Sequence, residues 1–218
     1  HLQSGIVLAI LKRYPEAGVE FELVSRNASS RYVEDALFQR AQMDFEQSNY
    51  TSAVSHYTRV INTSKSSRLL PYAYSRRAAA YFNLKNYGQT ADDYIKVLEE
   101  YPAHPVAQDL LLPLQESLNL SNRSAEFDQY LAHFKHANPD AKGIESVEFE
   151  TAKNLYFNQN YQKAIDNLSR YVASYPESAK IPEAKYYQAE SYYRMKDLTR
   201  ALETFHQLEG EQAFEMIN

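Results

Sequence analysis

The chain has 218 residues, of which 44% are hydrophobic and 23% charged, the balance of an ordinary globular protein. Its formal net charge of −5 speaks against a nucleic-acid partner, and no cluster of basic residues is longer than Arg76-Arg77. The absence of cysteine excludes disulfides, thiolate zinc sites and thiol catalysis, while five glycines beside nineteen tyrosines favour helices over a multistranded β protein.

The chain begins with an apolar run from Ile6 to Leu11. This run is too short to span a bilayer and is followed by Lys12-Arg13, so it predicts neither a membrane helix nor a signal peptide. We therefore expect no membrane insertion by this segment. Because the sequence opens on His1 and closes at Asn218 without a capping signal, we expect it to be part of a longer or processed chain.

An internal repeat of 36 to 37 residues runs through the whole sequence. Its anchor positions are Tyr14, Tyr50, Tyr87, Ser124, Tyr161 and Leu198. Small or apolar residues recur three, seven and ten positions after each anchor, as Ala164, Leu168 and Tyr171 do after Tyr161. This spacing predicts an amphipathic helix that starts at each anchor.

A second helix is predicted upstream of each anchor. Small residues stand nine positions before most anchors and aromatic residues five positions before, and a short polar break then separates the two helices. Each unit is therefore predicted to be a helical hairpin, in a single array over residues 1–218. Pro102, Pro139 and Pro176 follow the second helices, where proline ends a helix.

The unit in residues 106–139 is degenerate. Gln115 and Phe127 replace small residues, and Pro113 falls inside the predicted first helix, where proline costs roughly 3 kcal/mol. We expect this helix to start late or to kink. The unit then either bends the stack or marks a boundary between two subdomains.

The order of small residue, aromatic residue, turn, Tyr, Ala, aromatic residue and Pro resembles the tetratricopeptide repeat (TPR). The match is closest from Glu145 to Pro176. The consensus Trp and Leu-Gly pair are absent, and the units are two or three residues longer than the usual 34. Long units with a "YP-x-S/H" ending are similar to those of bacterial envelope proteins of the YbgF and BamD types.

The resemblance implies an all-α fold, a right-handed α-solenoid of about six hairpins, whose concave groove is lined by the first helices. It also implies a non-catalytic scaffold that binds a protein or peptide partner in that groove. The groove residues that we predict to contact the partner are Phe38, Gln42, Ser75, Phe149, Lys153, Phe157, Tyr186, Glu190 and Arg194.

The aromatic residues of the first helices leave two interpretations open. At the position shared by Phe38, Phe149 and Tyr186, a binding role and a packing role are both consistent with the pattern. At the other recurrent position, packing between repeats is expected from the family. The residues at that position are Phe45, Phe82, Tyr156 and Tyr193.

No motif in the sequence points to catalysis, a metal or a cofactor. His133 and His136 are three residues apart near acidic side chains, but two solvated histidines explain this pattern without a metal ion. Family members that hold a C-terminal carboxylate use Lys, Asn and Arg in the groove, whereas Phe38, Gln42, Ser75 and Ala79 stand at the corresponding places here. A role as an adaptor for chaperone tails is therefore not expected.

We accordingly expect an interaction scaffold, with a role in bacterial envelope assembly or maintenance, located in the periplasm or at the outer membrane. A cytoplasmic location is the alternative. The second functional hypothesis is self-association, in which the open ends of the array stack on another copy or dock on a larger multidomain protein.

Overall fold

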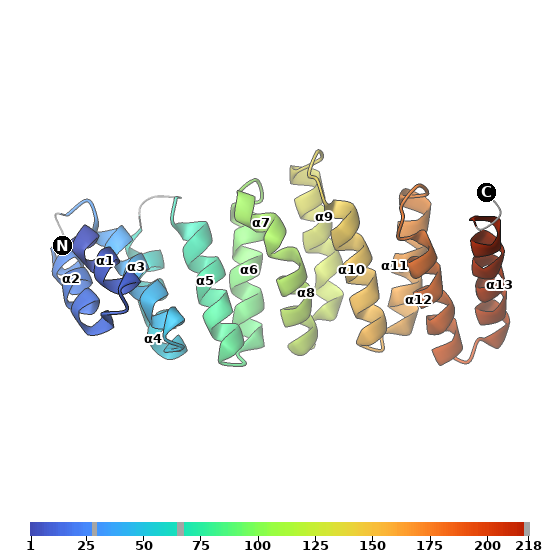
Figure 1. Cartoon of the computed structure of the whole chain (residues 1–218), viewed down its shortest axis with the longest axis horizontal. Helices are drawn as coiled ribbons and strands as arrows, with labels where there is room; N and C mark the ends of the chain where they lie inside the picture. The colour runs from blue at the N-terminus through green and yellow to red at the C-terminus, as the bar shows by residue number, and fades with distance from the viewer. Residues whose placement is uncertain (28–29, 65–67, 216–218) are drawn as a thin grey trace. The chain divides into compact units, whose positions relative to one another are not determined.

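The computed structural model describes residues 1–27, 30–64 and 68–215, and these residues form thirteen α-helices and one short 3-10 helix, with no strand (Figure 1). The predicted all-α fold is confirmed. The elements are α1 (Leu2–Ile10), α2 (Tyr14–Arg26), α3 (Val33–Glu46), α4 (Tyr50–Thr63), α5 (Leu70–Asn83), α6 (Tyr87–Glu100), α7 (Pro105–Asp109), α8 (Leu111–Leu120), η1 (Ser124–Glu126), α9 (Phe127–Ala137), α10 (Ile144–Phe157), α11 (Tyr161–Ser174), α12 (Ile181–Arg194) and α13 (Leu198–Glu215).

The helices pair into hairpins at the predicted registers. Five anchors, Tyr14, Tyr50, Tyr87, Tyr161 and Leu198, are the first residues of α2, α4, α6, α11 and α13. The sixth, Ser124, begins η1, which precedes α9. Because an amphipathic helix needs a neighbour to cover its apolar stripe, successive hairpins pack on one another within residues 1–139 and within residues 140–215.

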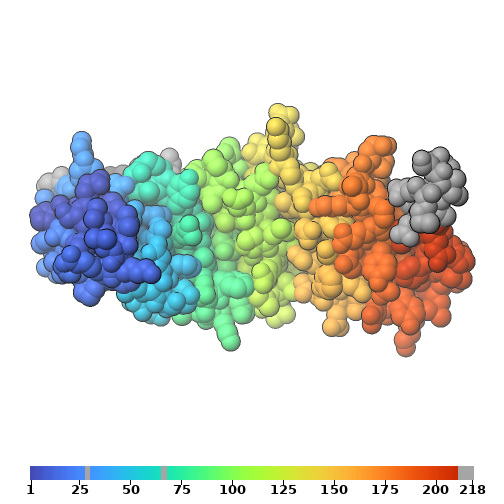
Figure 2. All heavy atoms as spheres, in the orientation of Figure 1, coloured from blue at the N-terminus to red at the C-terminus, as the bar shows by residue number. Residues whose placement is uncertain are grey.

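The chain divides into two compact units, unit 1 from His1 to Pro139 and unit 2 from Asp140 to Asn218. The boundary follows the degenerate repeat, where the sequence predicts either a bend in the stack or a boundary between two subdomains. In unit 1, the space-filling view shows successive hairpins packed against one another on the visible face (Figure 2). The single array over residues 1–218 stays a prediction.

Every hairpin in the described residues turns in the same way. One residue per turn adopts the left-handed conformation, with φ between 57° and 63°, and none of these residues is glycine: Lys12, Ser48, Lys85, Asn122, Gln159 and Lys196. The next residue donates its backbone N–H to a carbonyl five residues back, as Asn160 does to Leu155 at 2.9 Å. These are Schellman turns, which satisfy the last carbonyls of the first helix.

The "YP-x-S/H" ending is a turn followed by a helix start. The backbone N–H of Ser178 donates to the carbonyl of Tyr175 at 3.0 Å, and the Ser178 hydroxyl accepts from the N–H of Lys180 at 3.2 Å. The earlier copy has the same two contacts. The backbone N–H of His104 donates to the carbonyl of Tyr101 at 2.9 Å, and Nδ1 of His104 accepts from the N–H of Val106 at 3.2 Å. This ending therefore provides the polar partners that a new helix needs at its N-terminus.

Small residues at the repeat positions let the helices approach closely. Ala41, Ala78, Ala152 and Ala189 are fully buried on the first helices. In the first hairpin, glycine fills this place: a Cβ on Gly5 would lie 2.6 Å from the ring of Phe21. Large side chains fill the space between hairpins, which explains the alternation of small and large residues in the sequence.

The degenerate repeat has the late helix start predicted for it. Its first helix is divided into α7 and α8, with Leu110 between them. Pro113 is the third residue of α8, in the first turn, where the missing N–H leaves no hydrogen bond unmade. Its second helix, α9, starts three residues after the anchor, because η1 occupies those positions.

Candidate functional site

The largest group of predicted site residues lies in unit 2, on two successive first helices, α10 and α12. Backbone features fix both helix starts, since Gly143 has φ 86° before α10 and Pro182 lies in the first turn of α12. We call the resulting surface the α10–α12 face. It consists of Phe149, Lys153, Tyr156, Phe157, Glu183, Tyr186, Tyr187, Glu190, Tyr193 and Arg194.

A cluster of aromatic rings forms the centre of this face. The ring of Tyr156 lies 5.0 Å from that of Tyr187, 5.3 Å from Phe157 and 5.8 Å from Tyr161, measured between centroids. Tyr187 also packs on Phe157 at 5.6 Å and on Tyr186 at 5.5 Å. Such ring pairs contribute about 0.5–1.5 kcal/mol beyond the area they bury, so the cluster is a rigid platform.

Paired charges border the rings. The ammonium group of Lys153 donates to the carboxylate of Glu183 at 2.8 Å, and this hydrogen bond raises the pKa of Lys153. The Tyr156 hydroxyl donates to Glu190 at 3.3 Å, and Arg194 lies 3.7 Å from the same carboxylate. Burial raises the pKa of Tyr156, so its hydroxyl stays protonated at neutral pH.

The structure brings six of the nine predicted residues together on this face, but Phe149 is not available to a partner. Phe149 is 1% exposed and packs on Tyr171, with the ammonium groups of Lys153 and Lys180 above its ring. The prediction that it contacts a partner is wrong, and the packing alternative holds. Phe157 and Tyr186, in contrast, are 59% and 44% exposed.

Tyr193 does not pack between repeats, although its repeat position predicts this. The residue is 54% exposed. The equivalent residues Phe45, Phe82 and Tyr156 are partly buried, as predicted. Tyr193 differs because no further first helix follows α12 within the described residues to cover it.

The other three predicted residues lie in unit 1. Phe38 on α3 is partly buried and packs edge-on against Tyr57 at 5.6 Å. Gln42 donates to Glu46 one turn later at 3.3 Å, and Ser75 lies half-buried on α5. These side chains do not form an aromatic cluster like that of unit 2.

Sequence reasoning missed Tyr187, which joins the rings of both helices. Its repeat equivalents Gln39, Arg76 and Glu150 are polar, so the repeat pattern carries no signal for it. The doublet Tyr186-Tyr187 was the available signal. Adjacent helical residues point about 100° apart, so one ring of such a doublet turns toward the neighbouring helix.

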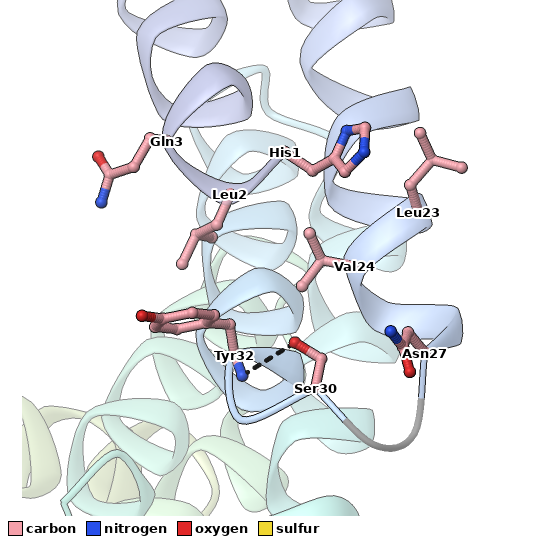
Figure 3. Close-up of a pocket in the computed structure, with 8 residues that line it drawn as sticks. All are labelled: His1, Leu2, Gln3, Leu23, Val24, Asn27, Ser30 and Tyr32. Carbon is pink, nitrogen blue, oxygen red and sulfur yellow. Dashed lines mark hydrogen bonds between the residues drawn. The ribbon is translucent and has the colours of Figure 1, made fainter.

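Two other features lie outside the α10–α12 face. His133 and His136 are both exposed on α9, and the described ranges contain no group of three His, Asp or Glu side chains arranged to hold a metal ion. A hollow of about 350 Å³ lies at the start of α1 and the end of α2, beside Leu2, Val24 and Tyr32 (Figure 3). None of the predicted site residues lines it.

No helix within the described residues is long and apolar enough to cross a membrane.

The comparisons with known proteins define the fold. Residues 147–178 and 183–211, both in unit 2, match the family model of the tetratricopeptide repeat. Among solved structures, a tetratricopeptide repeat protein from Parabacteroides merdae is 14% identical, with a TM-score of 0.58 over 96% of this chain and 78% of that one. No curated protein matches the sequence.

Two further structures are similar at the same level. One is a putative kinesin light chain from Podosopora anserina with nearly identical TPR-like repeats, 15% identical, with a TM-score of 0.53 over 83% of this chain and 95% of that one. The other is YrrB, a TPR protein with an unusual peptide-binding site, 16% identical, with a TM-score of 0.53 over 89% and 93%. The chain therefore has the fold of TPR proteins, and unit 2 contains two TPR segments. The resemblance to the YbgF and BamD types stays a prediction.

Proposed function

We propose that the chain is a non-catalytic scaffold that binds a polypeptide partner on the α10–α12 face. The observation that carries this proposal is the exposure of Phe157 and Tyr186 on a platform of packed rings, with Tyr193 exposed seven residues further along α12. Large exposed aromatic side chains that are already held in place lose little entropy on binding, which makes them effective anchors.

The fold supports a role in recognition. Hairpins of this kind present the first helices side by side, and α10 contacts α12 directly. Among the structural neighbours, YrrB has a peptide-binding site, which is a property of that protein. We infer a peptide ligand for this chain because its exposed rings lie on two adjacent first helices, a surface suited to an extended segment.

Selection from a library of random displayed peptides on the purified chain tests this proposal. The variant with Phe157→Ala, Tyr186→Ala and Tyr193→Ala is expected to lose the selected ligands, with affinities at least tenfold lower. The matched control replaces three side chains of unit 1 with similar exposure, Tyr32, Tyr72 and Leu84, which are 42%, 41% and 41% exposed. Selected peptides that bind the triple variant as tightly as the original chain contradict the proposal.

Self-association is the second candidate function, and the exposure of the first and last described hairpins favours it. Val7 on α1 is 53% exposed, whereas its repeat equivalents Met43 and Ala80 are 3% and 0% exposed. In the last hairpin, Leu202 is 56% exposed, although the equivalent Ala91 and Ile165 are buried. Both ends thus present positions that inner repeats cover with a neighbour.

Sedimentation velocity over a range of concentrations tests this second candidate. Head-to-tail stacking predicts open-ended oligomers that grow with concentration, because the two faces differ. Val7→Glu or Leu202→Glu alone is expected to abolish them, while Ser55→Glu on an exposed second-helix position serves as the control. A chain that stays monomeric at high concentration rules out self-stacking.

The bacterial envelope is the compartment that we propose for the protein, with a role in envelope assembly or maintenance. The proposal is supported by the unit length of 36 to 37 residues and by the "YP" endings at Tyr101 and Tyr175. Fractionation of the native host into cytoplasm, periplasm and membranes tests it, and recovery with cytoplasmic markers contradicts it.

A further inference from the structure

One stripe of α12 alternates carboxylates with tyrosine rings. Glu183, Tyr186, Glu190 and Tyr193 follow one another at spacings of three, four and three residues, which places them on one side of the helix. Tyr186 and Tyr193 are 44% and 54% exposed. Each exposed ring therefore has a carboxylate within one helical turn, of which Glu183 is paired with Lys153, and Glu190 with Tyr156 and Arg194.

The inner part of the α10–α12 face already uses a ring and a carboxylate to hold a cation. The Lys153 ammonium lies 5.6 Å from the centroids of both Phe149 and Tyr187, and it donates to Glu183 at 2.8 Å. A second ammonium group, that of Lys180, lies 4.9 Å from the Phe149 ring. The negative face of an aromatic ring attracts a cation in this geometry.

The net charge of unit 2 favours a basic partner. Its sequence contains thirteen Asp and Glu residues against nine Lys and Arg, whereas unit 1 contains fifteen against fourteen. Unit 2 therefore carries four of the five net negative charges of the chain. Such an imbalance accelerates the approach of a positively charged partner and disfavours acidic ones.

We propose that the α10–α12 face selects peptides that carry two Lys or Arg side chains three residues apart; this inference rests on the proposed function. Tyr186 and Tyr193 are seven residues apart on one helix, a rise of about 10 Å. In the polyproline II conformation, residues i and i+3 lie on the same side and about 9 Å apart. In a β-strand, the same-side spacings are about 7 Å and 13 Å, which fit the two rings less well.

Fluorescence anisotropy with the full chain and labelled synthetic peptides tests this spacing. The probe is Gly-Arg-Pro-Pro-Arg-Gly, in which proline favours the polyproline II conformation. The comparison peptides shorten or lengthen the separation by one proline, or replace both arginines by glutamate. We expect the three-residue separation to bind at least tenfold more tightly than any of these, and the affinity to fall as salt is raised.

Variants of the chain locate the contact. Tyr186→Ala combined with Tyr193→Ala is expected to raise the dissociation constant of the probe at least tenfold, and Glu190→Gln to raise it severalfold. The matched control, Tyr32→Ala combined with Tyr72→Ala in unit 1, is expected to leave it unchanged. Circular dichroism confirms that each variant keeps its helix content.

The outcomes separate this inference from the proposed function. Equal binding of the arginine and glutamate peptides, no preference for the three-residue separation, or binding that ignores both tyrosines overturns the inference. If the displayed library instead yields acidic or apolar peptides that depend on the exposed rings, the proposed function holds and the basic ligand is wrong. If the library ligands ignore the rings, the proposed function itself fails.

Discussion

Units 1 and 2 are built from the same hairpin but place their aromatic and charged side chains differently. In unit 1, Phe45 and Phe82 pack edge-on against the tyrosines that begin the next helices, and the rings are partly buried. In unit 2, three rings of the first helices are exposed on the α10–α12 face. The repeat fixes where a side chain lies along the backbone, while the neighbouring side chains decide whether it is buried or exposed.

One ion pair from each unit shows a similar contrast. In unit 1, Arg77 donates two hydrogen bonds to Asp93, at 2.8 and 2.7 Å, and a third to Thr58 at 2.9 Å. The two charged side chains are only 15% and 9% exposed. In unit 2, Lys153 and Glu183 are 25% and 44% exposed. The Arg77–Asp93 pair thus lies inside unit 1, whereas the Lys153–Glu183 pair lies open to solvent beside the exposed rings of unit 2.

The largest expected effect concerns Phe149, which was predicted to contact a partner but is buried in unit 2. Phe149→Ala is expected to destabilise unit 2 by about 3 to 5 kcal/mol, because it leaves a cavity beside Tyr171. Its unit 1 equivalent, Ser75→Ala, is expected to change stability by less than about 0.5 kcal/mol. Hydrogen exchange resolved by helix measures both. A loss below about 1 kcal/mol for Phe149→Ala contradicts the burial described above.

The ion pairs provide the second comparison. Arg77→Met is expected to destabilise unit 1 by about 3 kcal/mol, because it leaves the buried Asp93 carboxylate unpaired. Lys153→Met is expected to cost less than about 1 kcal/mol, since its pair is open to solvent. Urea unfolding followed by circular dichroism measures both, and similar losses for the two variants contradict the distinction.

The Arg77→Met defect is also expected to shrink in acid. Burial raises the pKa of Asp93 above its ordinary value of 3.8 even with Arg77 present. Without the guanidinium group, protonation relieves the buried charge as the pH falls toward that range.

A smaller effect is expected from Glu145, at the start of α10. Hydrogen bonds from Ser178 and Tyr171 lower the pKa of Glu145 below its ordinary value of 4.5. A lowered pKa contributes stability that is present above pH 4.5 and is lost as the pH falls through the folded-state pKa. Glu145→Gln is expected to flatten the acid dependence of unit 2 below about pH 5, while unit 1 amides are unaffected. Identical pH profiles of the two chains count against this assignment.

The smallest effect is expected to be equal in both units. Lys85 in unit 1 and Gln159 in unit 2 have φ of 59° and 61°, where a side chain is strained. Lys85→Gly and Gln159→Gly are each expected to raise stability by up to about 1 kcal/mol. Thermal unfolding measures the shift, with Arg170→Gly in the interior of α11 as a control that should destabilise. A loss of stability at either turn contradicts the role assigned to it.

Much of the fold could be predicted because the same apolar spacing and the same turn length recur in most repeats. The anchors mark helix starts because apolar spacing and turn length are both local properties, and Pro113 correctly predicted the late start of α8. The candidate site was less accessible. Phe149 and Tyr186 share a repeat position, yet one is buried and the other exposed, because Ile181 and Ala184 of α12 pack in the cluster that contains Phe149.

Tyr187 and Tyr193 show the same limit. Neither the polar equivalents of Tyr187 nor the partly buried equivalents of Tyr193 indicate what these two rings do. Their roles depend on which helix lies beside α12, a relation between repeats that a pattern within one repeat does not contain. The exposure of Tyr193 and the ring contacts that Tyr187 makes with both helices therefore required the structure.

The uniform hairpin turns have a consequence for how such a chain tolerates changes in length. Three residues separate the paired helices at 11–13, 47–49, 84–86, 158–160 and 195–197. The connections between hairpins hold four residues at 101–104 and six at 138–143 and 175–180. A residue inserted into a Schellman turn would break the paired hydrogen bonds that close it and shift the following helix relative to the first. Insertions, labels and fusion points therefore belong between hairpins, where the length already varies.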